Sequence, residues 1–107
     1  MKVEIKRTPV GVINPDFVNN MIRKYREVFG SLRIIEKHLE PVLKTFNLEF
    51  LYREDAFEPV FNAREDELLR YSVISKDEED DDCMLYLVVK KNGVIVIERE
   101  IRGGESS

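Results

Sequence analysis

The chain has 107 residues, a formal net charge of −4, and a composition of 43% hydrophobic and 36% charged residues. A chain of this length suits one domain with its own hydrophobic core, and this composition excludes an intrinsically disordered protein. The single cysteine, Cys83, excludes an intramolecular disulfide, so we expect a reducing, cytoplasmic environment. The sequence has no apolar run of the length that spans a membrane, and its first residues do not resemble a signal peptide.

The first predicted element is a strand over residues 1–8, because apolar and charged side chains alternate there. Pro9 and Gly11 are expected to end this strand. Asn14 is then well placed to cap a helix that starts at Pro15, since its side-chain oxygen can accept a backbone hydrogen bond from the first turn.

A long helix is predicted from Asn14 to Asn47, because apolar residues recur there at alternating spacings of three and four. A straight helix over this range would be about 48 Å long, whereas a domain of this size is about 35 Å across. We therefore expect the helix to break or bend at Gly30 or Pro41, with one bent element favoured over two helices, or its far end to pack against a second copy of the protein. The apolar stripe consists of Val18, Met21, Tyr25, Val28, Leu32, Ile35, Leu39, Val42 and Phe46.

Two strands and two charged connections are expected after the helix. Residues 48–52 and 68–75 alternate apolar and polar side chains, as strands with one solvent-exposed face do. Residues 55–67 between them are predicted to form a loop. The consecutive carboxylates from Asp77 to Asp82 are interpreted as a solvated connection, because they lack the glycine and the spacing of a calcium-binding loop. They could also dock a basic protein partner.

The last two predicted strands, residues 83–91 and 94–101, form a β-hairpin. Asn92 and Gly93 between them predict a two-residue type I′ turn, which needs positive φ at both positions. Such a turn fixes the register of the hairpin and would pair Val89 with Val96.

Both faces of this hairpin are apolar, although a sheet covered by a helix on one face is usually polar on the other. We therefore expect the second face, or the overhanging helix, to form a homo-oligomeric interface, with a dimer as the favoured assembly. The predicted interface residues are Leu85, Leu87, Val89, Val94 and Val96.

The sequence contains none of the motifs that mark common catalytic, cofactor-binding or metal-binding sites. No catalytic, cofactor-binding or metal-ligating residues are therefore predicted. His38 is interpreted as a surface or boundary residue near the helix bend, and Cys83 as a small strand residue. One histidine and one cysteine cannot build an ordinary structural zinc site within one chain.

The predicted fold is α+β, with a long N-terminal helix packed on one antiparallel sheet in the order β-α-β-β-β-β. Residues 1–102 form a single domain in this prediction, and residues 103–107 form a disordered tail. The predicted function is that of a non-enzymatic, oligomeric interaction or regulatory protein. The reason is that another molecule is expected to bury the second apolar face of the hairpin or the far end of the long helix.

Two alternative functions remain open. A small ligand could bind, or be chemically converted, in a cup between helix and sheet, where polar side chains would project into an apolar space. Nucleic acid could bind the basic side of the helix, although the negative net charge disfavours this alternative. The predicted pocket residues are Tyr52, Tyr71, Tyr86 and Arg99, and the basic helix residues are Arg23, Lys24, Arg26, Arg33 and Lys37.

Overall fold

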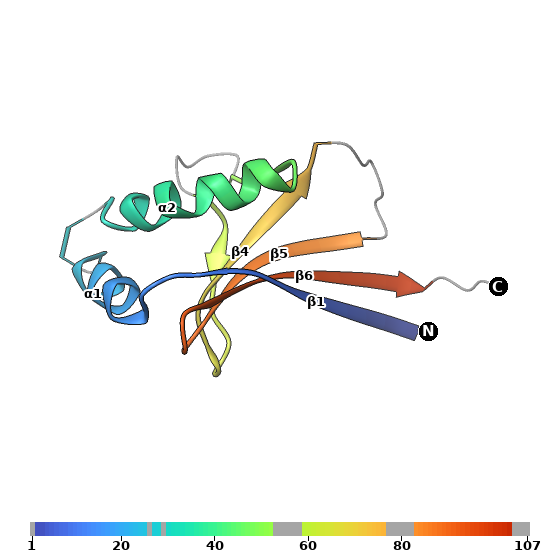
Figure 1. Cartoon of the computed structure of the whole chain (residues 1–107), viewed down its shortest axis with the longest axis horizontal. Helices are drawn as coiled ribbons and strands as arrows, with labels where there is room; N and C mark the ends of the chain where they lie inside the picture. The colour runs from blue at the N-terminus through green and yellow to red at the C-terminus, as the bar shows by residue number, and fades with distance from the viewer. Residues whose placement is uncertain (1, 26, 29, 53–58, 77–82, 104–107) are drawn as a thin grey trace.

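The computed structural model describes residues 2–25, 27–28, 30–52, 59–76 and 83–103 of the chain. Its strands form one antiparallel six-stranded sheet in the order β1-β6-β5-β4-β2, and the short β3 also pairs with β4. Both helices pack on the same face of this sheet (Figure 1), so the predicted α+β class with a single antiparallel sheet is confirmed. In chain order the elements are β1 (Lys2–Val12), α1 (Pro15–Tyr25), α2 (Leu32–Thr45), β2 (Leu48–Phe50), β3 (Phe61–Asn62), β4 (Glu67–Ser75), β5 (Cys83–Lys90) and β6 (Val94–Gly103).

The prediction of one long helix is wrong, because two helices follow β1. α1 ends at Tyr25 and α2 begins at Leu32. Gly30, between them, has a φ of +95°, a left-handed backbone conformation that ends a right-handed helix and that glycine adopts without strain. Pro41, the other predicted bend, lies inside α2 and does not end it. The element order is therefore β-α-α-β-β-β-β-β rather than the predicted one. No helix in the described part of the chain is long and apolar enough to cross a membrane.

The hydrophobic core lies between the helices and one face of the sheet. Phe17 of α1 contacts His38 of α2, with ring centroids 5.0 Å apart, so the helices also pack on each other. Burial of each large apolar side chain contributes about 1.5–3 kcal/mol to folding, which makes this layer the main source of stability. Its buried members are Val18, Met21, Leu32, Ile35, Leu39, Leu43, Leu48, Phe50, Leu69, Tyr71, Val73, Leu85, Leu87, Val89 and Ile95.

β1 is longer than predicted, because Pro9 and Gly11 do not end it. The pairing of β1 with β6 continues past both residues, with a β-bulge between them. Pro9 is tolerated because β1 is an edge strand, where a missing N–H does not interrupt pairing on both sides. The predicted helix cap after β1 is confirmed, since the Asp16 N–H donates to Asn14 Oδ1 at 2.9 Å and α1 begins at Pro15.

The β5–β6 hairpin exists as predicted, but its turn and register differ. Three residues lie between the strands, and only Gly93 among them has a positive φ, +89°. Its N–H donates to the Lys90 carbonyl at 2.9 Å. Val89 therefore pairs with Ile95 rather than with Val96. A shift of one residue exchanges the β6 residues that share a face with each β5 residue, so the predicted grouping of the two hairpin faces is wrong.

Three further predictions concern connecting segments. The predicted loop 55–67 contains β3, which is too short to give an alternating sequence pattern, and residues 53–58 lie outside the described residues. The acidic run from Asp77 to Asp82 also lies outside them. β6 continues through Gly103, and the rest of the predicted tail lies outside the described residues.

Candidate functional site

The face of the sheet opposite the helices, called the helix-free face below, carries the candidate site. Cross-strand pairing aligns its side chains in three neighbouring rows. Charged residues occupy the middle of this face, among apolar neighbours. The first row is Arg70, Val88, Val96 and Pro9, the second is Ser72, Tyr86, Glu98 and Arg7, and the third is Met84, Glu100 and Ile5.

A buried network of ion pairs lies at the centre of the helix-free face. The Arg70 guanidinium donates from Nη1 to Glu98 Oε2 at 2.6 Å and from Nη2 to Glu67 Oε2 at 2.6 Å. It also donates from Nε to Glu67 Oε1 at 2.9 Å and from Nη2 to Glu98 Oε1 at 3.2 Å. Arg7 of β1 donates to Glu98 Oε1 at 3.0 Å. These four residues, the Arg70 network, join three strands, and Glu98 is only 1% exposed.

A β-bulge in β4 brings Glu67 to the same face as Arg70. Residues three apart on a regular strand point to opposite faces, because side chains alternate. The register of β4 against β5 shifts between Glu67 and Leu69, and this extra residue turns Glu67 toward the helix-free face. The Arg64 N–H also donates to Glu67 Oε1, at 3.1 Å, so the turn before β4 is tied to the network.

The network favours the charged forms of Glu67, Glu98 and Arg70. Hydrogen bonds from Arg70 lower the pKa of Glu98 below its ordinary value, against the opposing effect of burial. Burial alone would raise the pKa of Glu67, but hydrogen bonds from Arg70 and from the Arg64 backbone lower it. Burial alone would lower the pKa of Arg70, yet both carboxylates raise it above its ordinary value. These three residues are therefore held together as ions.

Acid should weaken the fold through these two carboxylates. Since folding lowers the pKa of Glu67 and Glu98 below the ordinary 4.5, they stabilise the folded state above that pH. This stabilisation is lost as the pH falls through the lower folded-state values. Between about pH 6 and pH 3, Glu98→Gln should lose less unfolding free energy than the wild type, measured by urea unfolding at each pH. Glu49→Gln, at an exposed position of β2, is the control and should follow the wild type, whereas an unchanged pH dependence in Glu98→Gln would contradict the assignment.

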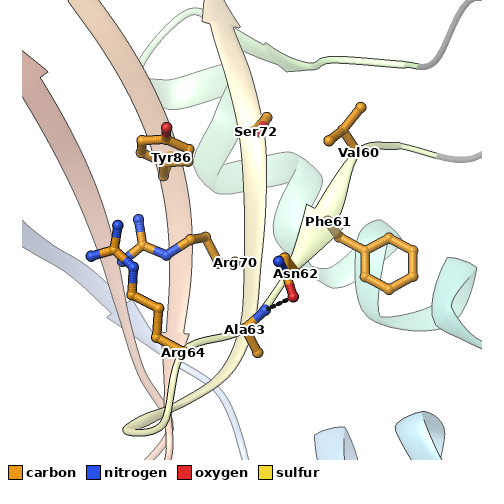
Figure 2. Close-up of a pocket in the computed structure, with 8 residues that line it drawn as sticks. All are labelled: Val60, Phe61, Asn62, Ala63, Arg64, Arg70, Ser72 and Tyr86. Carbon is orange, nitrogen blue, oxygen red and sulfur yellow. Dashed lines mark hydrogen bonds between the residues drawn. The ribbon is translucent and has the colours of Figure 1, made fainter.

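A pocket of about 310 Å³ lies beside the Arg70 network, between β3, β4 and β5 (Figure 2). Its volume is at the lower end of the range for small-molecule sites. The Arg70 guanidinium carbon lies 4.9 Å from the centre of the Tyr86 ring, which is a cation–π distance. The polar lining residues are Asn62, Arg64, Arg70, Ser72 and Tyr86, and the apolar ones are Val60, Phe61 and Ala63.

The third row and the outer edge of β1 form a second feature of this face. Ile5 is 40% exposed and Met84 42% exposed, and both flank Glu100 in the pairing. Within the described residues, β1 pairs only with β6, so its outer edge is available to another strand. Exposed apolar residues next to an open sheet edge are typical of an association surface.

The five predicted interface residues lie on two different faces. Leu85, Leu87 and Val89 point toward the helices and are buried in the core. Val94 and Val96 lie on the helix-free face, where Val96 is 6% exposed. The register of the hairpin explains this division, because the predicted pairing had placed all five together.

The four predicted pocket residues are not brought together. Tyr71 is buried in the core, where burial and the nearby Glu36 carboxylate raise the pKa of its hydroxyl. Tyr86 lines the pocket beside the Arg70 network. Tyr52 lines a separate pocket of about 370 Å³ between α2 and β2. Arg99 lies on β6 opposite Lys6, on the face that the helices cover.

The other candidate side chains lie on the helix layer. His38 is exposed, and its Nδ1 is 2.8 Å from the Ile34 carbonyl. The basic helix residues are divided between α1, with Arg23 and Lys24, and α2, with Arg33 and Lys37, while Arg26 lies outside the described residues. Among the described residues, no group of three or more histidine, cysteine or carboxylate side chains could hold a metal ion.

Sequence reasoning missed the members of the Arg70 network. Arg70 stands between Leu69 and Tyr71, and Glu98 follows Ile97, so each is a charged residue inside an apolar strand. This is the signal that could have identified them, because charged residues are almost never buried unless paired. The bulge that adds Glu67 leaves no comparable mark in the sequence.

Comparison of the chain with models of protein families, with curated proteins and with solved structures gave no match. The structural class of the protein is therefore described from its fold and its candidate site alone. The chain is an α+β protein whose antiparallel sheet carries two helices on one face and a buried arginine–glutamate network on the other.

Proposed function

We propose that the protein is a homodimeric, non-enzymatic interaction protein that assembles through the outer edge of β1. The observation that carries the proposal is the self-complementary charge along this edge. β1 has 11 residues, about twice the usual strand length. Its outer backbone N–H and C=O groups can form a ladder with a strand of another molecule.

One half of this edge is suited to pairing. Pro9 and the bulge beside it obstruct the half nearer α1, because proline has no N–H and a bulge bends the strand. Residues 2–8 pair with β6 without a shift in register. The accessible part of the edge is therefore centred on Ile5, whose side chain is 40% exposed.

An antiparallel pair of two β1 strands, with Ile5 opposite Ile5 of the second copy, is self-complementary. Glu4 then stands opposite Lys6 of the second copy, and Lys6 opposite its Glu4, both on one face. The two isoleucines meet on the other face. Such a pairing has two-fold symmetry, as the interfaces of most homodimers do, and opposite charges directly across a ladder stabilise it.

The neighbouring strand gives a reason for this partner. Lys6 lies opposite Arg99 of β6, so no carboxylate of β6 stands directly across from it. A carboxylate from Glu4 of the second copy would stand directly across from Lys6 on its other side, as an opposite-charge pair does in a ladder. The dimer would also join the two sheets, so that both helix-free faces lie on the same side of one continuous surface.

Charge reversal tests this proposal directly. Glu4→Lys and Lys6→Glu should each weaken dimerisation about 10- to 100-fold, because two symmetry-related pairs change from attractive to repulsive. The double variant Glu4→Lys/Lys6→Glu restores opposite charges at both positions and should recover the wild-type dissociation constant to within about threefold. Sedimentation equilibrium at several concentrations measures these constants.

The control is Glu40→Lys, which changes the net charge as Glu4→Lys does but at an exposed position of α2. It should leave dimerisation unchanged. A strictly monomeric wild-type mass at micromolar concentration would contradict the homodimer. A dimer that both single variants leave intact would exclude this register at the β1 edge.

A further inference from the structure

We infer that the pocket beside the Arg70 network binds a small organic carboxylate with a flat, apolar body. The pocket lies on the helix-free face between β3, β4 and β5, away from the outer edge of β1 at the other end of the sheet. The inference therefore does not depend on the proposed dimer.

The charge around the pocket favours an anion. The charged side chains that line the pocket, Arg64 and Arg70, are both cationic. The charge of Arg70 is paired with Glu67 and Glu98, so Arg64 supplies the positive charge that is open to an anion. The carboxylates are engaged by Arg70, whereas the Arg64 side chain lines the pocket. In Figure 2 the guanidinium groups of Arg64 and Arg70 point to the same end of the pocket. An anion bound at this end would offset the excess positive charge.

Several residues that line the pocket carry hydrogen-bond donors. Asn62 Oδ1 accepts from the Ala63 N–H at 2.8 Å, which leaves the amide nitrogen of Asn62 as its donor toward a ligand. The four hydrogen bonds that Arg70 makes to Glu67 and Glu98 leave one N–H of Nη1 unused. Ser72 and Tyr86 also line the pocket, and their hydroxyls lie at the other end from the two guanidinium groups (Figure 2). A carboxylate has two oxygens that can each accept two such bonds.

The pocket is also preformed and partly apolar. Four hydrogen bonds fix the Arg70 guanidinium, and it lies over the Tyr86 ring. Groups held in place before binding lose little entropy when a ligand arrives. Val60, Ala63 and the Tyr86 ring supply apolar surface to the pocket, whereas the Phe61 ring packs on Tyr71 in the core. This apolar surface suits a hydrocarbon body rather than a bare inorganic anion. The volume of about 310 Å³ limits the ligand to a small molecule.

Titration of the isotope-labelled protein with benzoate, followed by the amide resonances of Ser72 and Tyr86, tests the inference. Benzoate should shift these resonances in a saturable way at millimolar concentration. Arg64→Gln should weaken binding about 10- to 100-fold, because it removes a charge-assisted hydrogen bond. Arg33→Gln is the matched control on α2 and should bind as the wild type does.

Two further probes separate the parts of the inference. Benzamide has the same body without the charge, and inorganic phosphate has charge without the body, so both should bind at least about tenfold more weakly than benzoate. Absence of benzoate binding, equal binding of benzamide or phosphate, or unchanged affinity in Arg64→Gln would each overturn it. The variant Glu4→Lys, in which dimerisation should be weakened, should retain benzoate binding, which distinguishes failure of this site from failure of the dimer proposal.

Discussion

Replacing Arg70 by methionine should lower the free energy of unfolding by about 3–5 kcal/mol. The variant removes four hydrogen bonds and leaves Glu67 and Glu98, which are 5% and 1% exposed, as buried carboxylates without their main partner. Arg7 would still contact Glu98, but its side chain is 51% exposed and cannot replace a buried guanidinium. Urea unfolding followed by circular dichroism at neutral pH measures the loss.

The stability lost in Arg70→Met should come mainly from the buried carboxylates that this variant leaves without a partner. Removing Glu98 as well, in Arg70→Met/Glu98→Met, should recover part of the lost stability, because one unpaired buried charge disappears. The control is Asp66→Asn, which breaks the exposed ion pair with Lys90 at 2.9 Å and should cost far less than Arg70→Met, because solvent screens an exposed pair. If Arg70→Met cost no more than Asp66→Asn, the network would not be a buried ionic centre.

The helical part of the fold could be predicted except at one residue. The apolar spacing correctly identifies the buried face of both helices, from Val18 in α1 to Leu39 in α2. It does not reveal the break, because the period continues across Gly30. Glycine is compatible with a helix interior at a modest cost, and only its φ of +95° in the folded chain shows that it lies in a break between two helices. Periodicity therefore predicts which face is buried more reliably than where a helix ends.

The register of the sheet could not be predicted from local sequence patterns either. Side chains of β5 and of β6 alternate between the two faces as expected. The turn, however, decides which β6 side chains share a face with which β5 side chains. Asn92 and Gly93 fit two turn types, and the close approach of the chain at Ile13 to Gly93 is a tertiary contact that a local pattern cannot contain. The register in turn places Tyr86 beside Glu98, so the candidate site could not be assembled from the sequence.

Gly93→Ala should be among the most destabilising single substitutions in this chain, at about 3 kcal/mol or more. A Cβ at this position would lie 2.2 Å from the Ile13 carbonyl oxygen and 3.0 Å from Pro15 Cδ, and the φ of +89° is itself strained for alanine. The substitution would also disturb the hydrogen bond from the Ile13 N–H to the Gly93 carbonyl, 2.8 Å long, which holds the start of α1 against the β5–β6 turn.

Gly30→Ala provides the comparison that separates backbone strain from close contact. Gly30 has a similar φ of +95°, but a Cβ there would meet nothing within 4 Å. Its substitution should therefore cost only the left-handed strain of about 1–2 kcal/mol. Urea unfolding of both variants measures the difference, which should be at least about 1 kcal/mol. Equal costs would mean that the backbone at Ile13 moves away at no penalty, and the turn would then not be locked against α1 by Gly93.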